Sequence, residues 1–372
     1  MQSRRILIVG GGIAGLALAT ALCRRALDAE LVEREPRWTP VGGGIAVQPN
    51  AMRVLHELGI GSIVDRAGAR VHHWLFRNQH GELLCDIALK SLWGEVGPFI
   101  GIARTKLHDA LLAAALSCRL GVSVTALSQD EHHVLASFSD GIAREYDLVI
   151  GADGVHSTVR RVAFASTDPV FGGQMVWRSL GKLPGPQLDS VQFWLGEGCF
   201  FGLCPVGNGL TYGFANVTTP RFHDPLESRL ERLRLRFADF GPLVRDYLDS
   251  LERDDQIHCT SIEWLPYEHW HSGRVILIGD AAHASSPMMG QGGSMAMEDA
   301  LVLAETLDEA PNLPAAKEAF VARRRPRVAW VRQQSQAVGE MLRLPASRRD
   351  PALRESGKYR FCERFAPLTA PP

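Results

Sequence analysis

Short unbroken apolar runs mark several buried strands along the chain. Residues 5–9 (RILIV), 147–151 (DLVIG) and 273–279 (GRVILIG) have almost no polar interruption. Strands of a parallel sheet that is covered by helices on both faces read this way, because neither face meets water. Residues 16–22 follow the first run at helical spacing, and residues 29–32 form a second strand. The pattern therefore predicts a parallel sheet with helices packed on it.

A second group of strands lies between these runs. Residues 71–89 predict a hairpin with a turn at residues 78–81. Further strands are expected at residues 174–181, 190–195, 199–206, 210–217 and 256–264. A helix near residues 225–251 separates the last two. These segments predict a mostly antiparallel sheet that packs against the first one.

Two segments near the C-terminus have a weaker pattern. Residues 320–336 predict an amphipathic helix, and we expect its basic face to be solvated or ion-paired. That face consists of Arg323, Arg324, Arg325 and Arg327. Beyond residue 345 proline and charge increase, so residues 346–372 are expected to form a loose tail.

The composition narrows the class of protein. The 372 residues include 40 basic and 41 acidic side chains, which leaves no charge excess to attract nucleic acid or an anionic membrane. No window reaches the ~18 apolar residues of a membrane span. The seven cysteines are scattered and form no C-x-x-C pair, so we expect neither a disulfide framework nor a metal site. Together with the lack of signal-peptide features, this predicts a cytosolic protein.

A glycine motif links the first strand to the first helix. In the segment 10–15 (GGGIAG), Gly10 permits a tight turn, Gly12 lets the backbone approach a pyrophosphate, and Gly15 lets the helix pack closely on the strand. Glu33 follows at the distance expected for an acid that holds a ribose hydroxyl. The motif predicts a dinucleotide site. Arg34 leaves two interpretations open, the 2′-phosphate of NADP or the adenine and phosphates of another dinucleotide.

Carboxylates stand at the ends of two later strands. Asp153 and Asp280 follow the runs at 147–151 and 273–279. Ligands of open α/β sheets bind at the carboxyl ends of strands, so both acids fall where a cofactor is expected. The segment 287–294 (PMMGQGGS) then opens a helix, and such a glycine-rich loop is a second anion-binding helix N-terminus.

In order and spacing, these motifs resemble the single-component FAD-dependent aromatic hydroxylases of the para-hydroxybenzoate hydroxylase type. The resemblance covers about residues 4–335. It implies an α/β fold with a Rossmann-like FAD-binding domain and a mostly antiparallel β-sheet substrate domain. The expected domain division is 1–70, 100–167 and 266–345 for FAD, 71–99 and 168–265 for the substrate, and 346–372 for the tail.

The resemblance also implies roles for individual residues around FAD. At the adenosine and pyrophosphate end it points to Gly10, Gly12, Ala14, Gly15, Glu33, Arg34 and, more loosely, Leu127. At the ribityl chain and flavin it points to Ala46, Arg104, Asp280, Gly290, Gly292 and Gly293. Asp153 and Gly154 match a family motif that is credited with contacts to both FAD and NAD(P)H.

The substrate pocket is expected between the two domains. Arg178 matches a Trp-Arg pair that is frequent at the family's substrate face, although a surface arginine on a strand is an equal alternative. Gln48 belongs to a loop that resembles the one passing the flavin ring. Phe193, Phe201 and Tyr212 are candidates for an aromatic wall or for ordinary core. Pro287, Met288 and Met289 are candidates for an apolar lid or, for the methionines, core filler.

The implied activity is that of an FAD-dependent monooxygenase. Such an enzyme uses NAD(P)H and O2 to hydroxylate a small aromatic or heteroaromatic substrate through a flavin C4a-hydroperoxide. The histidines single out no catalytic base, and we assign no catalytic residue. A non-catalytic flavin-binding homologue and a flavin-dependent halogenase stay open as alternatives, and the protein is expected to be a monomer or a homodimer. The missing second glycine motif and C-x-x-C pair disfavour a disulfide reductase.

Overall fold

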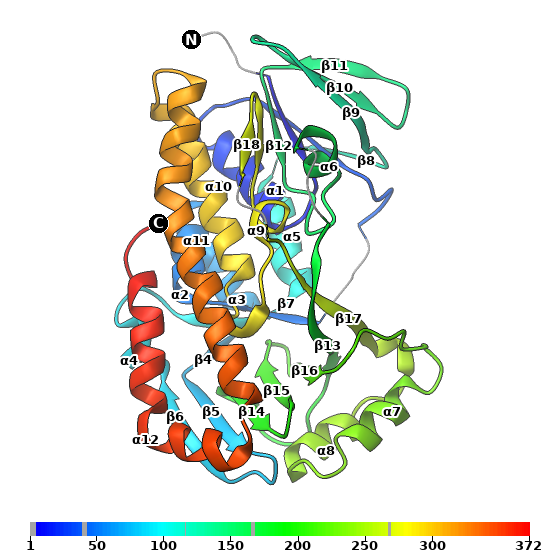
Figure 1. The fold of residues 1–372 in the computed structure, drawn as a ribbon, viewed down its shortest axis with the longest axis vertical. Helices are drawn as coiled ribbons and strands as arrows, with labels where there is room; N and C mark the ends of the chain where they lie inside the picture. The colour runs from blue at the N-terminus through cyan, green and yellow to red at the C-terminus, as the bar shows by residue number, and fades with distance from the viewer. Residues whose placement is uncertain (1–4, 39–42, 116, 165–167, 267–268) are drawn as a thin grey trace.

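The computed structural model describes residues 5–38, 43–115, 117–164, 168–266 and 269–372. A six-stranded sheet at one end of the molecule has the order β18-β19-β12-β1-β2-β8 (Figure 1). Its strands are β1 (Ile6–Val9), β2 (Ala29–Glu33), β8 (Cys118–Leu120), β12 (Leu148–Gly151), β18 (His271–Ser272) and β19 (Val275–Leu277). All neighbours pair in parallel except β18 with β19. The apolar runs therefore form the predicted parallel sheet.

Helices cover this sheet and fill the layer beside it. The helix α1 (Ile13–Cys23) packs against α10 (Gly292–Glu309). The shorter helices are α2 (Pro49–Glu57), α3 (Gly61–Ala67), α4 (Leu89–Trp93), α5 (Arg104–Ala114), α6 (Thr158–Phe164) and α9 (Asp280–His283). Ten of the eleven residues of α1 are buried, which fits its almost wholly apolar sequence.

A seven-stranded sheet at the other end has the order β17-β13-β16-β15-β14-β5-β6 (Figure 1). Its strands are β5 (His73–Asn78), β6 (Leu83–Ala88), β13 (Val170–Gly181), β14 (Ser190–Leu195), β15 (Cys199–Pro205), β16 (Thr211–Thr218) and β17 (Ile257–Trp264). Among the described strands of this sheet, β14 and β5 pair in parallel and all other neighbours are antiparallel. This is the mostly antiparallel sheet that the sequence predicts, with the predicted hairpin at its edge.

The helix expected near residues 225–251 is two helices. After α7 (Arg229–Arg236) the chain turns, and α8 (Pro242–Asp249) starts with Pro242 in its first turn and Gly241 as N-cap. Proline fits that first turn because its missing N–H would have no helical partner there. Both helices cover one face of the antiparallel sheet and enclose a second core around Phe201, Phe237 and Tyr247.

Two small sheets complete the fold. One has the order β3-β7-β4, and the other β11-β10-β9. Their strands are β3 (Gly44–Val47), β4 (Ala69–Val71), β7 (Phe99–Ala103), β9 (Val124–Gln129), β10 (Val134–Phe138) and β11 (Ala143–Tyr146). Three short 3₁₀ helices are η1 (Asp254–Gln256), η2 (Pro287–Met289) and η3 (Ala366–Leu368).

The expectation of a loose C-terminal tail is wrong. Residues 346–365 form α12 (Ala346–Phe365), which packs on β6 beside the long helix α11 (Leu313–Arg343) (Figure 1). Its apolar side chains at Leu353, Phe361 and Phe365 are buried. Four-residue spacing places them on one face of the helix, which also buries Arg349 and Gly357.

The basic face of α11 is ion-paired, as one of the two expectations had it. Arg323 pairs with Glu305, and Arg324 and Arg327 both pair with Glu298. Arg324 is fully buried, so it does not belong to a solvated face.

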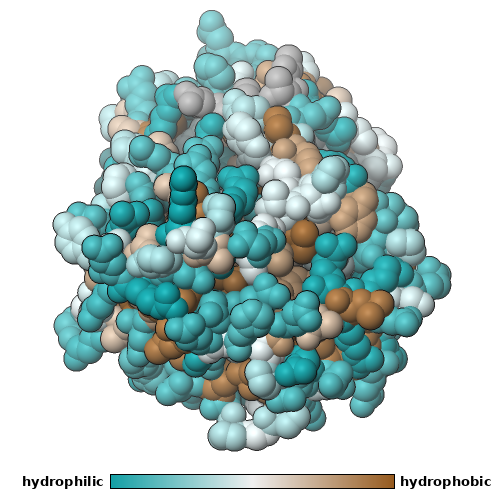
Figure 2. All heavy atoms as spheres, turned by 60° about the horizontal axis from the view of Figure 1, so that its bottom comes forward, coloured by the Kyte–Doolittle hydropathy of each residue, from teal (hydrophilic) through white to brown (hydrophobic). Residues whose placement is uncertain are grey.

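Polar side chains dominate the face formed by the lower end of the molecule in Figure 1, and apolar side chains appear there only in small groups (Figure 2). Among the residues described, no helix combines the length and the apolar character that crossing a membrane would require.

Candidate active site

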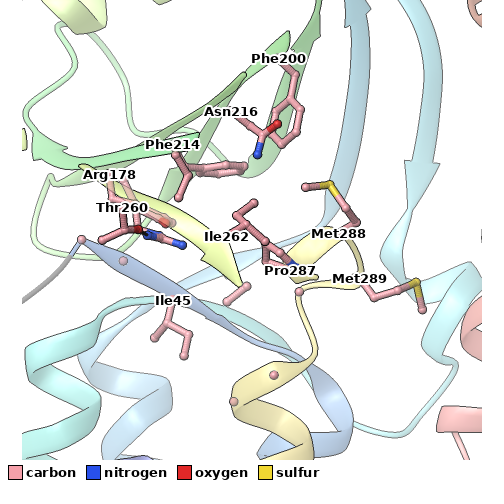
Figure 3. A pocket seen from close by; sticks show the side chains of 18 of the residues that line it. Ile45, Arg178, Phe200, Phe214, Asn216, Thr260, Ile262, Pro287, Met288 and Met289 are labelled. Atoms are coloured by element: carbon pink, nitrogen blue, oxygen red, sulfur yellow. Dashed lines mark hydrogen bonds between the residues drawn. The ribbon is translucent and has the colours of Figure 1, made fainter. Parts of the chain in front are cut away.

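A cavity of about 970 Å³ lies between the antiparallel sheet and the loop that leads into α10 (Figure 3). The strands β13, β14, β15, β16 and β17 supply one wall. The strand β3, the 3₁₀ helix η2 and the start of α10 supply the opposite wall, and α11 and α12 close one end. Its volume is at the upper end of the range of small-molecule sites.

The glycine motif forms an open cradle at the N-terminus of α1. Gly10 has a φ of +108°, a conformation that favours glycine. A Cβ on Gly15 would lie 1.9 Å from the carbonyl oxygen of Gly10, so only glycine lets the helix approach this closely. Gly12 is the N-cap of α1, and an added Cβ there would meet no protein atom within 4 Å. Ala14 lies in the first turn. Open space before unpaired helical N–H groups fits the pyrophosphate of a dinucleotide.

Glu33 lies directly against this cradle. Its Oε2 accepts a hydrogen bond of 2.7 Å from the Gly11 N–H. The ring of Trp38 covers Gly11, where an added Cβ would come within 2.5 Å of it. The ring of His108 lies 4.9 Å from that of Trp38, and its Nε2 is 3.0 Å from the Gly11 carbonyl oxygen. Sequence reasoning missed Trp38 and His108, which belong to no motif. The contact of Glu33 with a ribose stays a prediction.

The start of α10 forms the second cradle. Gly292 and Gly293 are its first residues, and their N–H groups are among the donors that a helix leaves unpaired. Asp280 opens α9, and its Oδ1 lies 3.9 Å from where a Cβ of Gly292 would be. Other predicted cofactor residues share this wall of the cavity, namely Ala46, Arg104 and Gly290. Backbone donors beside a carboxylate fit a flavin ring with its polyol chain.

Gln48 holds this loop in shape. Its Nε2 donates to the carbonyl oxygens of Met289 at 2.8 Å and of Gly290 at 3.1 Å. Its Oε1 accepts from Nε2 of Gln291 at 2.8 Å. Gln48 lines the cavity, but the loop uses its polar atoms. Its predicted contact with the substrate therefore stays a prediction.

A buried ionic cluster lies beneath the loop. Asp299 on α10 accepts hydrogen bonds from the Gly279 N–H at 3.0 Å and from Arg324 Nε at 2.8 Å, and its Oδ2 lies 2.6 Å from His283 Nε2. Burial opposes ionisation of Asp299, yet the charges and hydrogen bonds of His283 and Arg324 outweigh it and lower its pKa. The cluster fixes Asp280 through the adjoining Gly279. His283 therefore has a structural role here, because it holds Asp299 in place against Gly279.

Four other predicted cofactor residues lie outside the cavity wall. Asp153 caps α6, since its Oδ2 accepts from the Thr158 N–H at 2.7 Å. Gly154 has a φ of +80° and open space around it. Arg34 is exposed, and Leu127 lies on β9. Their cofactor roles stay predictions.

Alternating strand residues form the wall that faces the flavin loop. Arg178, Phe193 and Tyr212 line the cavity, as do the lid candidates Pro287, Met288 and Met289. Sequence reasoning missed further lining residues on these strands, including Phe200, Phe214, Asn216, Thr260 and Ile262 (Figure 3).

Of the two interpretations of Phe201, the structure supports ordinary core, and the place in the aromatic wall is wrong. Its ring packs into the second core, 5.2 Å from that of Phe237 and 6.0 Å from that of Tyr247, on the face away from the cavity. The neighbouring residue Phe200 faces the cavity instead. Because side chains alternate along a strand, an error of one residue reverses the face.

The strand wall carries an arginine that points into the cavity. Arg178 reaches into the cavity, and its Nη1 donates to Thr260 Oγ1 at 2.7 Å (Figure 3). Burial lowers the pKa of His258, and the charges of Arg178, Arg229 and Arg104 lower it further. Burial raises the pKa of Tyr212, although the charge of Arg178 opposes that shift. The site therefore favours a neutral imidazole and, beside Arg178, an anionic ligand.

The family model described as an FAD binding domain matches residues 4–335 of the chain. The chain belongs to this family. This flavoprotein is 34% identical over 322 residues to the aurachin C monooxygenase/isomerase of Stigmatella aurantiaca. The matched region covers 85% of this chain and 84% of that relative. The flavoprotein is 33% identical over 360 residues to the 3-amino-4-hydroxybenzoate 2-monooxygenase of Streptomyces cremeus, covering 92% and 88%.

A solved structure extends the likeness to the fold. The complex of Klebsiella pneumoniae HpxO with FAD and uric acid superposes with a TM-score of 0.89 at 26% identity, covering 99% of this chain and 97% of that one. The predicted fold class and cofactor are thereby confirmed. The flavoprotein is an FAD-dependent monooxygenase of the aromatic hydroxylase class, with NAD(P)H as co-substrate.

Proposed function

We propose that this monooxygenase hydroxylates a small aromatic or heteroaromatic ring whose acidic hydroxyl binds as an anion beside Arg178. One observation carries the proposal: in the described ranges Arg178 forms no ion pair, although it reaches into the cavity. Two other arginines of the cavity wall are already neutralised, since Arg229 pairs with Asp224 and Arg221 with Glu263. A cation without a carboxylate partner supports an anionic ligand.

Charge on the ring oxygen would serve the reaction. An anionic oxygen pushes electron density into an aromatic ring and makes it more reactive toward an electrophilic oxygen atom. A cation about 4 Å away stabilises that anion by about 4 kcal/mol at an effective dielectric constant near 20. Arg178, oriented by Thr260, is proposed to hold the substrate in this form.

The opposite wall would handle the cofactor. When bound, FAD takes reducing equivalents from NAD(P)H and passes one atom of O2 to the substrate. The N–H groups of Gly292 and Gly293, with the positive end of the α10 dipole, would stabilise negative charge on the flavin edge. Pro287 and Met288 would keep water from the reacting atoms.

The expected result is NAD(P)H oxidation that accelerates when a suitable phenol is added in air to the FAD-loaded enzyme. The assay uses phenol, 4-hydroxybenzoate and 4(1H)-quinolone, each with NADH and with NADPH, and follows peroxide and product mass. A product heavier by one oxygen atom supports the proposal. If no ring accelerates the oxidation, or if only peroxide forms with every ring, the proposal fails.

A variant tests the role of Arg178 directly. Phenol and its methyl ether anisole have the same ring, but only phenol ionises. We expect Arg178→Met to weaken phenol binding about 10- to 100-fold and anisole binding much less, because hydrogen bonds to charged groups contribute about 1.5–3 kcal/mol. Perturbation of the flavin absorbance gives both dissociation constants. Equal losses for the two ligands would contradict the assignment.

We also propose the domain division given above, action in the cytosol, and a monomeric or homodimeric state. All seven cysteines are free thiols, which supports a reducing compartment. Light scattering on the FAD-loaded protein measures the oligomeric state.

A further inference from the structure

Asn216 is a buried amide whose oxygen is hydrogen-bonded within the described part of the protein and whose nitrogen is not. It lies on β16, is 2% exposed and lines the cavity. Its Oδ1 accepts a hydrogen bond of 3.0 Å from Gln174 Nε2 on the adjacent strand β13. Among the residues that the structure describes, its Nδ2 has no hydrogen-bond partner. Since most buried polar groups in native proteins are paired, this donor calls for an explanation.

The hydrogen bond from Gln174 decides which end of the amide is left free. Gln174 is itself buried, and its donation holds the Asn216 oxygen away from the cavity. The amide nitrogen lies on the cavity side, beside the rings of Phe200 and Phe214 (Figure 3). Asn216 is directly opposite Phe200 across β15 and β16, and the two phenylalanine rings are 6.2 Å apart. The surroundings of the free N–H groups are therefore apolar.

The donor and its apolar surroundings determine what kind of ligand group can bind to Asn216 Nδ2. An amide N–H donates and does not accept, so the partner is a hydrogen-bond acceptor. An apolar corner without a cation does not favour an anion, because an anion would lose its hydration there. The acceptor is thus a neutral oxygen. A carbonyl on an aromatic substrate combines this atom with a flat apolar body that fits between phenylalanine rings.

We propose that Asn216 Nδ2 donates a hydrogen bond to a carbonyl oxygen on the substrate and so determines specificity. This inference rests on the proposed function, which places the substrate ring in the same cavity. It adds a second recognition point to the anion site at Arg178.

The strand register sets the spacing of the two points. Arg178 is paired with Phe214 across β13 and β16, and Asn216 lies two residues further along on the same face. The guanidinium of Arg178 is held at Thr260 on β17, on the other side of β13. Val176 of β13 is paired with both Thr260 and Asn216, so two strand spacings, about 10 Å in all, separate the backbones of these two residues. The carbonyl and the acidic hydroxyl therefore stand at opposite ends of one ring. A para-hydroxylated aryl ketone has this layout.

Matched ligand pairs test the inference on the FAD-loaded enzyme. The pair 4-hydroxyacetophenone and 4-ethylphenol differs by a carbonyl in place of a methylene, and 4-hydroxybenzaldehyde and 4-methylphenol repeat the comparison. Dissociation constants come from the flavin absorbance change without NAD(P)H. We expect the wild type to bind the carbonyl member of each pair at least about tenfold more tightly, because the carbonyl gains one buried hydrogen bond and also makes the hydroxyl more acidic.

Two variants assign that preference to a residue. Asn216→Leu is expected to reduce it about tenfold, the share of one buried hydrogen bond, and to leave the share that comes from the more acidic hydroxyl. Gln192→Leu is the matched control, because Gln192 is also a buried amide of the same sheet, on β14, but lies outside the cavity wall and bonds Arg77 and Ser190. It is expected to keep the preference.

A wild type without preference in both pairs, or without binding to any of the four ligands, overturns the inference even where a variant does not fold. So does an Asn216→Leu enzyme that keeps the preference. Turnover is not needed for this measurement, so a preference that depends on Asn216 with no hydroxylated product would refute the proposed function alone.

Discussion

Gly12 and Gly15 lie three residues apart, yet they constrain the chain for different reasons. At Gly15 the protein itself excludes a side chain, because the Gly10 oxygen is 1.9 Å from an added Cβ. At Gly12 nothing in the protein excludes one, and its φ of −79° suits any residue. We therefore expect that glycine is required at position 12 because of the bound ligand.

Substitution at the two glycines is therefore expected to separate folding from cofactor binding. Gly12→Val should leave the unfolding free energy of the FAD-free protein within about 0.5 kcal/mol of wild type, while FAD binding weakens at least about 100-fold. Gly15→Val should lower that unfolding free energy by about 1–3 kcal/mol, because the helix must move away from the strand. Urea unfolding and FAD titration measure the two effects. A Gly12→Val protein that is purified yellow would contradict the pyrophosphate assignment.

Residues that belong to a local sequence motif could be placed from the sequence. Residues whose position depends on partners far along the chain could not. The glycines and Asp280 belong to local motifs, so their places follow from the sequence. Phe201 was misplaced because both faces of β15 are apolar, one toward the cavity and one toward α7 and α8. Alternation then gives no hint of which face is which. Asn216 escaped because its partner Gln174 is 42 residues away.

At the scale of elements, the strands were predicted more closely than the helices. β14 spans the expected residues 190–195, whereas the C-terminal helix α12 was expected to be loose. Proline 351 and a high charge obscured its apolar face, which shows only in the four-residue spacing of Leu353, Phe361 and Phe365. The rings of Phe361 and Phe365 meet an aromatic cluster, with Phe361 stacked 5.0 Å from Phe76.

The packing of α12 predicts a contrast between two of its aromatic residues. Phe361→Ala should lower the unfolding free energy by about 3 kcal/mol, since it removes a ring that is 3% exposed. Tyr359→Ala, on the same helix and 66% exposed, should change it by no more than about 0.5 kcal/mol. Denaturant unfolding of both variants makes the comparison. Equal, small effects would mean that α12 contributes little to the folded state.

At the scale of the whole molecule, Arg324 joins parts of the chain that are distant in sequence. From α11 it donates to Glu298 Oε2 at 2.6 Å and to Asp299 Oδ1 at 2.8 Å on α10. Glu298 also accepts from Asn50 on α2 at 2.8 Å, and Asn50 donates to Gln291 in the flavin loop. The ionic cluster thus ties the wall of the cavity to the longest helix.

Arg324→Met is expected to destabilise the protein by about 3–5 kcal/mol at pH 7, because it leaves buried carboxylates with less compensating charge. The loss should depend on pH. In the wild type the lowered pKa of Asp299 adds stability that is fully present above its unfolded-state pKa of about 3.9. Burial raises the pKa of Asp299, and in the variant the charge of Arg324 no longer opposes that effect. The pKa of Asp299 therefore rises, and protonation of Asp299 in mild acid removes part of the destabilisation. The difference in urea unfolding free energy between wild type and variant should therefore shrink from pH 8 to pH 5.

The control Arg323→Met removes a half-exposed pair with Glu305 and should cost at most about 1 kcal/mol without that trend. A loss for Arg324→Met that stays constant across this pH range would show that packing, and not charge, accounts for it.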